Sequence, residues 1–323
     1  MSQPEILIAA PMLPVVMDAL AARFRVHHLW EQPDKAAFLD ETGLRIRGLA
    51  VSTLFGRVDA ALLDRLPGLE IIASFGVGYD NVDAAGAAAR GVIVTNTPGV
   101  LDEEVADLTL GLLLATLRQI PQADRYLREG RWTERSFPLS ATLRGRRVGI
   151  IGLGRIGKAV ARRLAAFDVE VAYHGRSRQP GAHYAFHATA IELAAASDVL
   201  IVLAPGGPAT SHIVDAAVLA ALGPGGVLVN VSRGSLVDQP ALIAALQTGV
   251  ILAAGLDVYD DEPRVPAALI ALPNTVLLPH IGSGSFATRN AMGSLVADNL
   301  IAWFETGRPL TPVAETAHLS PAS

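Results

Sequence analysis

The chain of 323 residues contains no cysteine. This absence excludes disulfides, catalytic thiolates, cysteine-ligated zinc and iron–sulfur clusters together. Without a disulfide framework, the cytoplasm is the expected compartment.

Charged residues are scarce, at 18% of the chain, and 26 Lys and Arg stand against 31 Asp and Glu. Because no block of five or more basic residues occurs, we expect no DNA or RNA partner. Apolar runs such as residues 108–117 are far shorter than the roughly 20 residues that span a bilayer, so no membrane segment is expected. The apolar stretch 6–17 contains Pro11 and Pro14 and follows no basic residue, which favours a first strand and turn over a signal peptide.

Hydrophobic residues, by contrast, make up 51% of the sequence, and the length favours two domains. Continuous Val- and Ile-rich runs predict strands that are buried on both faces. These runs are residues 6–10, 48–51, 70–74, 92–95, 147–151, 169–173, 199–203, 227–231, 251–258 and 275–278. Ala- and Leu-rich segments of helical spacing separate them, including residues 60–66, 157–167, 191–195, 216–222 and 239–247. This alternation predicts an α/β fold with parallel sheets.

Two long helical patterns indicate where the chain passes between domains. Residues 103–118 follow a Pro-Gly pair and precede a polar stretch, so we place the first crossing there. Residues 285–304 follow the last strand and lead the chain back to the first domain. The predicted domains are therefore residues 1–100 together with 285–323, and residues 101–284.

A glycine-rich turn follows the predicted strand 147–151 directly and leads into a helical pattern. Its residues are Gly152, Leu153, Gly154, Arg155, Ile156 and Gly157. The first glycine permits the tight turn, the second lets the backbone approach a pyrophosphate, and the third allows close packing of helix on strand. In this strand-turn-helix context the pattern predicts a dinucleotide site, with the phosphates at the helix N-terminus.

The next strand, residues 169–173, ends in a turn that contains Arg176, Ser177 and Arg178. An NAD site usually places a carboxylate in that turn for the ribose 2′-hydroxyl, and none is present. Guanidinium groups suit a 2′-phosphate instead, so we predict NADPH or NADP as the preferred cofactor, with NADH or NAD possible. The alternative is a pair of solvated arginines on a loop.

Three later strands each end in a turn with one ionisable residue: Arg233, Glu262 and His280. Ligands of open α/β sheets bind beyond the carboxyl ends of the strands, so these side chains are expected to face one crevice. Reduction of a 2-oxo acid needs a cation for the substrate carboxylate, supplied by Arg233, and a proton donor at the carbonyl, supplied by His280. A carboxylate at Glu262 favours the protonated imidazole. Taken singly, an arginine or a histidine at such a position more often has a structural role than a catalytic one, and only the combination of the three residues indicates catalysis.

Asp257 and the remaining histidines are considered separately from these three residues. Asp257 lies in a very apolar strand end and either orients a neighbour at the site or is a satisfied structural aspartate. The remaining histidines show no paired ligand spacing on a helix, so no metal site is predicted.

Taken together, these segments resemble the D-isomer-specific 2-hydroxyacid dehydrogenase family, in its glyoxylate/hydroxypyruvate reductase branch. The resemblance covers nearly the whole chain and includes residues 74–83, 97–107, 152–157 and the turns with Arg233, Glu262 and His280. It implies two doubly wound parallel-sheet domains, with a Rossmann nucleotide-binding domain inserted into a flavodoxin-like substrate-binding domain. It also implies a homodimer joined largely through the nucleotide-binding domain. The turn at residues 174–177 is similar to that of NADP-preferring relatives.

The same resemblance implies further site residues. Backbone N–H groups of Val77 and Gly78 hold the substrate carboxylate alongside Arg233, and Leu54 lies in a loop that flanks the substrate. Additional cofactor contacts are expected from Pro205, Val231, Ser232, Asp257, His280 and Gly282. The residue at Gly284 is more often alanine in the family.

Several functions remain open at this point. The leading one is an NADPH-dependent reductase of small 2-oxo acids such as glyoxylate and hydroxypyruvate. Because Phe55 places an aromatic ring in the loop at residues 52–56, a hydroxyphenylpyruvate-type reductase is an alternative. A non-catalytic NAD(P)-sensing protein, like the corepressors that share this fold, is a second alternative, and a phosphite or formate dehydrogenase is a third.

Overall fold

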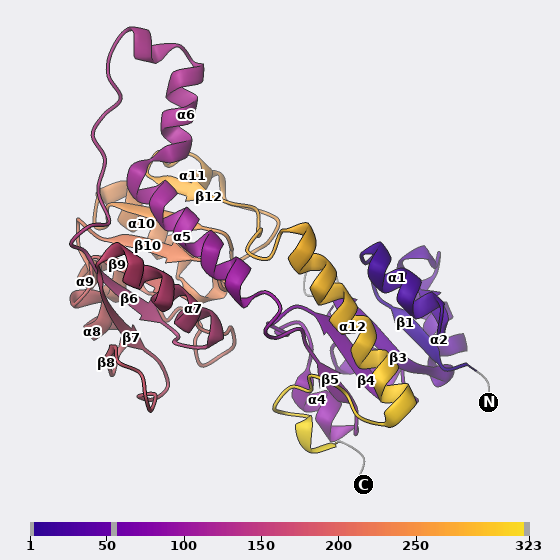
Figure 1. The fold of residues 1–323 in the computed structure, drawn as a ribbon. Helices are drawn as coiled ribbons and strands as arrows, with labels where there is room; N and C mark the ends of the chain where they lie inside the picture. Colours follow the sequence, from indigo (N-terminus) through magenta and orange to yellow (C-terminus); the bar gives the residue numbers. More distant parts are fainter. Residues whose placement is uncertain (1–2, 53–56, 320–323) are drawn as a thin grey trace. The chain divides into compact units, whose positions relative to one another are not determined.

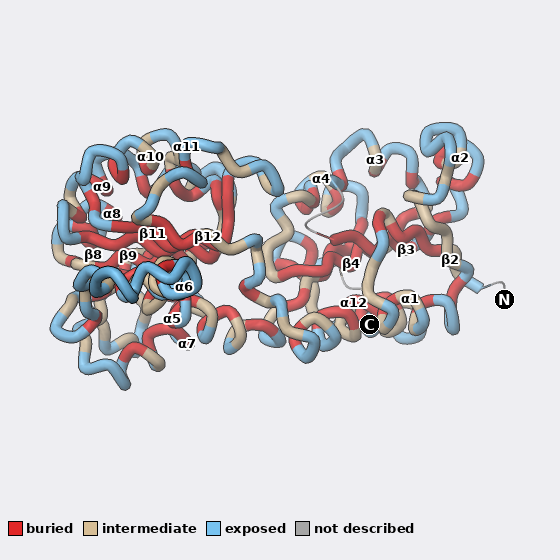
Figure 2. Tube along the Cα trace, turned by 90° about the horizontal axis from the view of Figure 1, so that it is seen from above, coloured by how far each residue is buried: buried red, intermediate tan, exposed pale blue. Residues whose placement is uncertain are grey.

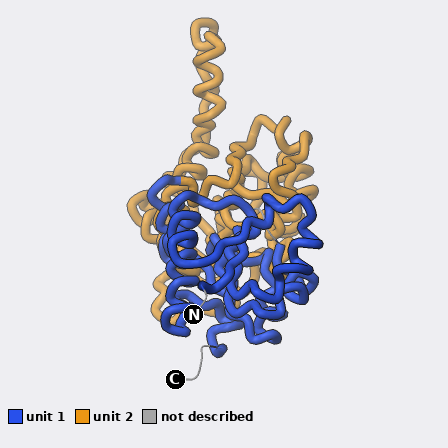
Figure 3. Tube along the Cα trace, turned by 90° about the vertical axis from the view of Figure 1, so that its right-hand side faces the viewer, with its two compact units in different colours: residues 1–101, 285–323 blue, residues 102–284 orange. Residues whose placement is uncertain are grey.

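The computed structural model describes residues 3–52 and 57–319. The chain divides into two compact units, Met1–Leu101 with Ser285–Ser323, and Asp102–Gly284, which Figure 3 shows in different colours. None of the helices in the described residues combines the length and hydrophobicity needed to span a lipid bilayer.

The first unit is built on a five-stranded parallel sheet in the order β2-β1-β3-β4-β5. This is the strand order of the flavodoxin-like domain that the family resemblance implies. The helix α12 (Phe286–Thr306) packs on β4 and on α1, so the C-terminal part of the chain completes this unit (Figure 1). The strands are β1 (Glu5–Ile8), β2 (Arg25–His28), β3 (Ile46–Ser52), β4 (Ile71–Phe75) and β5 (Ile93–Thr95), and the other helices are α1 (Pro14–Ala21), α2 (Lys35–Thr42), α3 (Ala60–Asp64) and α4 (Ala84–Ala89).

The second unit is built on a seven-stranded parallel sheet in the order β12-β11-β10-β9-β6-β7-β8. The order reverses between β6 and β9, as in a Rossmann fold. The strands are β6 (Arg147–Ile151), β7 (Glu170–His174), β8 (Ala185–His187), β9 (Val199–Val202), β10 (Val227–Asn230), β11 (Ala253–Leu256) and β12 (Thr275–Leu277). The helices are α5 (Asp102–Arg118), α6 (Ile120–Arg128), α7 (Arg155–Leu164), α8 (Ala190–Ala195), α9 (Ala216–Leu222), α10 (Gln239–Thr248) and α11 (Ala267–Ile270).

Central strands of both sheets are buried along their whole length, which Figure 2 shows as red tube. In β9 and β10 every residue is buried, because helices cover both faces of the sheet. The predicted α/β fold with two parallel sheets is therefore confirmed.

Four elements differ from the predictions. The edge strands β2 and β8 were not predicted, because their sequences Arg-Val-His-His and Ala-Phe-His are short and largely not buried. The prediction of a turn after β1 was wrong for residues 14–17, which open α1 with Pro14 at its first helical position. The polar stretch after α5 begins with a helix, α6, which is polar on average and in which only Tyr126 is buried.

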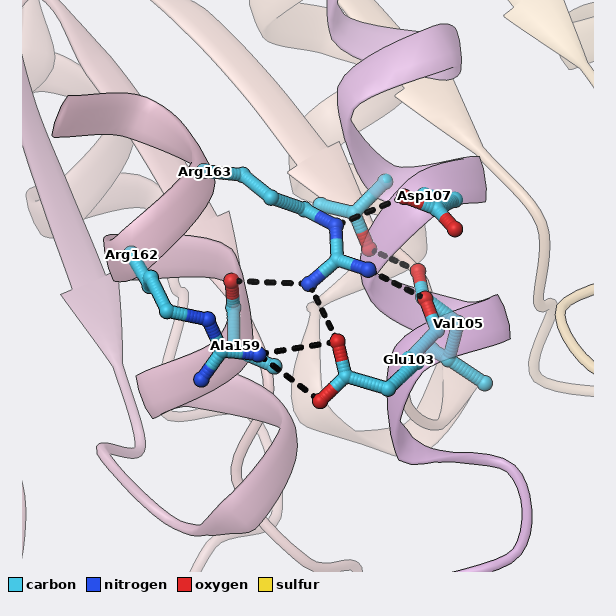
Figure 4. Close-up of polar contacts among 7 residues, drawn as sticks. Glu103, Val105, Asp107, Ala159, Arg162 and Arg163 are labelled. Carbon is cyan, nitrogen blue, oxygen red and sulfur yellow. Dashed lines mark hydrogen bonds and ion pairs between the residues drawn. The ribbon is translucent and has the colours of Figure 1, made fainter. Parts of the chain in front are cut away.

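An ion-pair network joins α5 to α7 inside the second unit (Figure 4). The Arg163 guanidinium lies 2.6 Å from Asp107 and 2.7 Å from Glu103, and Arg162 donates to the same Glu103 carboxylate at 2.8 Å. The hydrogen bond from Arg163 to Asp107 raises the pKa of this guanidinium further, although partial burial opposes the shift. Because α7 begins at the glycine-rich turn, these ion pairs hold the helix of the candidate phosphate site against α5.

We expect the substitution Arg163→Met to lower the free energy of unfolding by about 1–2 kcal/mol, since it removes several charge-assisted hydrogen bonds on a side chain that is only 21% exposed. Chemical denaturation measures the change. The matched control is Arg128→Met, because Arg128 pairs with Asp124 but is 75% exposed. Equal effects of the two substitutions would show that the α5–α7 network adds nothing beyond a surface ion pair.

Candidate active site

In the second unit, the candidate residues all follow the carboxyl ends of parallel strands. The glycine-rich turn follows β6, the arginine turn (Arg176, Ser177, Arg178) follows β7, Arg233 follows β10, Glu262 follows β11 and His280 follows β12. Because the strands are parallel, these turns share one edge of the sheet.

The glycine-rich turn fits a dinucleotide pyrophosphate. Gly152 has a φ of +99°, and a Cβ atom there would lie 2.6 Å from the backbone nitrogen of Ala204. A side chain at Gly157 would overlap the carbonyl oxygen of Gly152, whereas a Cβ at Gly154 would meet no heavy atom of the described residues within 4 Å apart from its own chain neighbours. The helix α7 begins at Arg155 without a side-chain cap, so its first N–H groups remain for an anion.

The arginine turn fits a 2′-phosphate. Arg176, Ser177 and Arg178 are exposed. Within the described residues neither guanidinium has a hydrogen bond or an ion pair to a protein group, and no carboxylate lies in the turn. Two cationic groups are therefore available to a dianion.

His280 and Glu262 form a direct pair, in which His280 Nδ1 lies 2.6 Å from Glu262 Oε2. The other carboxylate oxygen accepts a hydrogen bond from the Tyr259 N–H at 2.9 Å. A carboxylate can only accept, so Nδ1 carries the proton and Nε2 is the ring nitrogen left for a substrate. The sequence placed these residues 18 positions apart, and the fold brings them into contact.

Opposing effects determine the pKa of Glu262. Burial alone would raise the pKa, but the hydrogen bonds from His280 and Tyr259 and the charges of His280 and Arg233 outweigh it and hold the pKa below its usual range. Arg233 is thus close enough to act on Glu262 by its charge. The three predicted catalytic residues gather at one place in the second unit.

Local contacts position Arg233 after β10. The buried Asn230 donates from Nδ2 to the Arg233 carbonyl at 2.8 Å, and the Arg233 guanidinium donates to the Ser232 carbonyl at 2.8 Å. Only glycine fits at the next residue, because a Cβ at Gly234 would overlap the backbone of Tyr259. This close approach brings the turn after β10 against the turn after β11.

Asp257 holds the turn that contains His280. Its carboxylate, which is fully buried, accepts N–H bonds from Ile281 and Gly282, each at 2.8 Å. Burial raises the pKa of Asp257, while these two N–H groups and the charge of His280 oppose the rise. His280 itself has a φ of +54°, a left-handed conformation that is uncommon for residues other than glycine. Asp257 therefore fixes the backbone directly after His280, a contact that fits both an orienting and a structural role.

Other predicted cofactor residues also lie at strand ends. The Ser232 hydroxyl donates to the Ala204 carbonyl, which joins the end of β10 to the end of β9. The Pro205 carbonyl accepts from the Thr210 hydroxyl at 2.7 Å, and Val231 is buried. These contacts fix the backbone of the edge between the glycine-rich turn and Arg233.

The predicted substrate residues Val77 and Gly78 belong to the first unit, in the turn after β4. Asn96 donates from Nδ2 to the Val77 carbonyl at 2.7 Å. Because a peptide is planar, this bond directs the Gly78 N–H to the opposite side. Leu54 lies outside the described residues.

Sequence reasoning missed several supporting residues, namely Asn96, Tyr259 and Gln179. Each follows a predicted strand, which is the signal that was available, but their partners are distant backbone groups that a pattern does not reveal. Tyr259, for example, donates to the Leu278 carbonyl at 2.9 Å and so connects the ends of β11 and β12. In the described part of the chain, no three His, Asp or Glu side chains gather as a metal site.

Comparison with known proteins adds independent information. Residues 110–282 match the NAD binding domain of the D-isomer specific 2-hydroxyacid dehydrogenases. The chain is 47% identical to a hydroxyphenylpyruvate reductase from Plectranthus scutellarioides over 95% of this chain and 98% of that protein. It is 45% identical to a glyoxylate/hydroxypyruvate reductase A from Arabidopsis thaliana, with the same coverage.

A solved structure is similar along almost the whole length. It is an NADPH-dependent glyoxylate/hydroxypyruvate reductase from Sinorhizobium meliloti in complex with NADP and malonate. The TM-score is 0.93 and the identity is 53%, covering 98% of each chain.

Proposed function

Because this chain belongs to the D-isomer specific 2-hydroxyacid dehydrogenase family, we propose that it is an NADPH-dependent reductase of small 2-oxo acids, of the glyoxylate/hydroxypyruvate type, that forms D-2-hydroxy acids. The observation that carries this proposal is the contact between His280 and Glu262 beside Arg233. The 53% identity to an NADPH-dependent glyoxylate/hydroxypyruvate reductase supports the choice of substrate and cofactor.

When bound, NADPH supplies a hydride for the carbonyl carbon of the substrate. The residues of the chain bind the substrate and provide the proton. Arg233 pairs with the substrate carboxylate through its planar fork, and His280 donates a proton from Nε2 to the carbonyl oxygen, which becomes the hydroxyl group. Glu262 stabilises the imidazolium before the transfer. Asp257 keeps the His280 turn in place through the N–H groups of Ile281 and Gly282.

We assign the first unit to substrate binding and the second to NADP binding. In the first unit, the N–H groups of Val77 and Gly78 are proposed ligands of the substrate carboxylate, with the turn oriented by Asn96. In the second, the glycine-rich turn takes the pyrophosphate and the arginine turn takes the 2′-phosphate. The strand-end residues Pro205, Val231, Ser232, Asp257, His280 and Gly282 contact the remainder of the cofactor.

A homodimer in the cytoplasm is part of the same proposal. The helix α6 and the chain that follows it project from the body of the second unit (Figure 1). This arm exposes large apolar side chains: Leu127 is 55% exposed, Trp132 66% and Leu139 99%. Apolar groups at such exposure support an interface with a second copy.

The experiment that tests the function is a set of initial rates with NADPH or NADH and glyoxylate, hydroxypyruvate, pyruvate or hydroxyphenylpyruvate. We expect the highest kcat/KM with NADPH and glyoxylate or hydroxypyruvate. The 47% identity to a hydroxyphenylpyruvate reductase makes the aryl substrate the second candidate, and a preference for it would replace the small 2-oxo acid. Absence of turnover with all four acids would overturn the proposed reductase.

The substitution Glu262→Gln tests the coupling of the pair. Because the pKa of Glu262 lies below its usual range, its carboxylate remains charged at neutral pH. Glutamine removes that charge but still accepts the Tyr259 N–H, so the imidazolium loses its neighbouring anion. We expect the alkaline limb of kcat/KM for reduction to move to lower pH by about one unit or more.

A pH–rate profile measures this shift. The control is Asp261→Asn, which removes an adjacent carboxylate whose partner is the exposed Arg264. The control profile should match that of the unmodified enzyme. A Glu262→Gln profile that coincides with both would show that the pair is not coupled in catalysis.

A further inference from the structure

The arginine turn is closed by Gln179, the residue directly after it. The Gln179 side chain donates from Nε2 to the Leu153 carbonyl at 2.6 Å, and Leu153 belongs to the glycine-rich turn. The backbone N–H of Gln179 donates to the Tyr173 hydroxyl at 2.8 Å, and Tyr173 is only 1% exposed. Gln179 thus connects the arginine turn both to the glycine-rich turn and to the buried end of β7.

The other end of the arginine turn is tied to the same place. The Gly152 N–H donates to the His174 carbonyl at 2.9 Å, directly before the turn begins. Residues 175–178 therefore span two attachment points, Gly152 at one end and Leu153 at the other. Neither attachment involves Arg176 or Arg178, so both guanidinium groups stay available for a ligand.

We propose that Gln179 is a specificity-determining positioning residue for NADPH, because it fixes the spacing between the group that takes the 2′-phosphate and the group that takes the pyrophosphate. This inference rests on the proposed function. Arginine side chains are long and flexible, so the position of their backbone determines where the guanidinium groups can reach.

Physical chemistry predicts an unequal effect on the two cofactors. NADPH places its pyrophosphate at the glycine-rich turn and its 2′-phosphate at the arginine turn. A fixed spacing between the two turns favours its binding, because once the pyrophosphate is bound the 2′-phosphate binds without further ordering of the arginine turn. NADH lacks the 2′-phosphate and does not use the arginine turn in this way. Loss of the hydrogen bond from Gln179 to Leu153 therefore weakens the binding of NADPH more than the binding of NADH.

The test is the substitution Gln179→Met, which keeps the length of the side chain but removes the amide donor. We expect the Kd and KM for NADPH to rise about three- to tenfold, and those for NADH to change less than about twofold. The kcat at saturating NADPH should not change. Tyr173→Phe removes the hydroxyl acceptor and should shift the NADPH/NADH ratio in the same direction.

The matched control is Gln122→Met. Gln122 also donates from its side chain to backbone carbonyls, those of Pro273 and Thr275, but at the opposite edge of the same sheet. It should leave the ratio of the two Kd values unchanged, and thermal unfolding of each variant verifies folding.

The outcomes separate the inference from the proposed function. The inference is wrong if the unmodified protein prefers NADPH and Gln179→Met leaves the ratio of the Kd values for NADPH and NADH unchanged, which includes an equal loss of affinity for both. The proposed function stands in that case. If the unmodified protein shows no preference for NADPH, the proposed cofactor is wrong, and the role of Gln179 fails with it.

Discussion

The substitution His280→Ala is expected to lower kcat/KM for 2-oxo acid reduction by about 10²- to 10⁴-fold at every pH, the usual contribution of a general acid. Glu262 holds the ring at Nδ1, so the substitution removes the proposed proton donor from the position where it is fixed. A loss of this size corresponds to about 3–5 kcal/mol of transition-state stabilisation.

The fold should survive this substitution. Asp257 binds the backbone N–H groups of Ile281 and Gly282, and these bonds do not depend on the side chain at position 280. Steady-state rates and NADPH binding are measured together, with His280→Gln as a second variant and His318→Ala as the control, because His318 is exposed and lies in the first unit. Retention of more than about a tenth of kcat/KM in both His280 variants would remove His280 from the proton-donor role.

The substitution Arg176→Asp is expected to reverse or abolish the preference for NADPH. Two charge-assisted arginine contacts favour NADPH by about ten- to several-hundred-fold, less where salt screens them. Aspartate repels the 2′-phosphate and offers an acceptor to the 2′-hydroxyl of NADH, so the kcat/KM for NADPH falls much more than that for NADH. Increasing salt should also reduce the preference of the unmodified enzyme.

The control for this change of charge is Arg144→Asp. Arg144 is exposed and precedes β6, so it lies at the opposite edge of the sheet from the arginine turn. It should leave the ratio of the two kcat/KM values unchanged. If Arg176→Asp lowers kcat/KM equally for NADPH and NADH, the 2′-phosphate does not bind at this turn. The roles proposed for the catalytic residues do not depend on that result.

The sequence predicts the buried strands well, but it does not reveal the more exposed edge strands β2 and β8. Strands such as β9 and β10 are buried on both faces and therefore consist of continuous apolar runs. The edge strand β2 contains Arg25 and two histidines, which are compatible with its partial exposure but give no periodic pattern. The edge strands β5 and β12 are equally short, but they are largely buried and are predicted from their apolar runs.

In the candidate site, the local features can be predicted from the sequence, whereas the contacts between distant residues cannot. The glycine-rich turn is local, so its residues can be identified from spacing, and the turns with Arg233, Glu262 and His280 can be identified from their places after strands. The contact of His280 with Glu262, the left-handed backbone of His280 and the bond from Gln179 to Leu153 arise from tertiary packing. Such contacts join residues that no single-sequence pattern relates.

The most direct test of the proposed reaction is the fate of deuterium when hydroxypyruvate is reduced with NADPH that carries two deuterium atoms at C4. The chemistry proposed for this site predicts D-glycerate with one deuterium at C2, determined by chiral chromatography and mass spectrometry. L-glycerate, or D-glycerate without deuterium at C2, would contradict it.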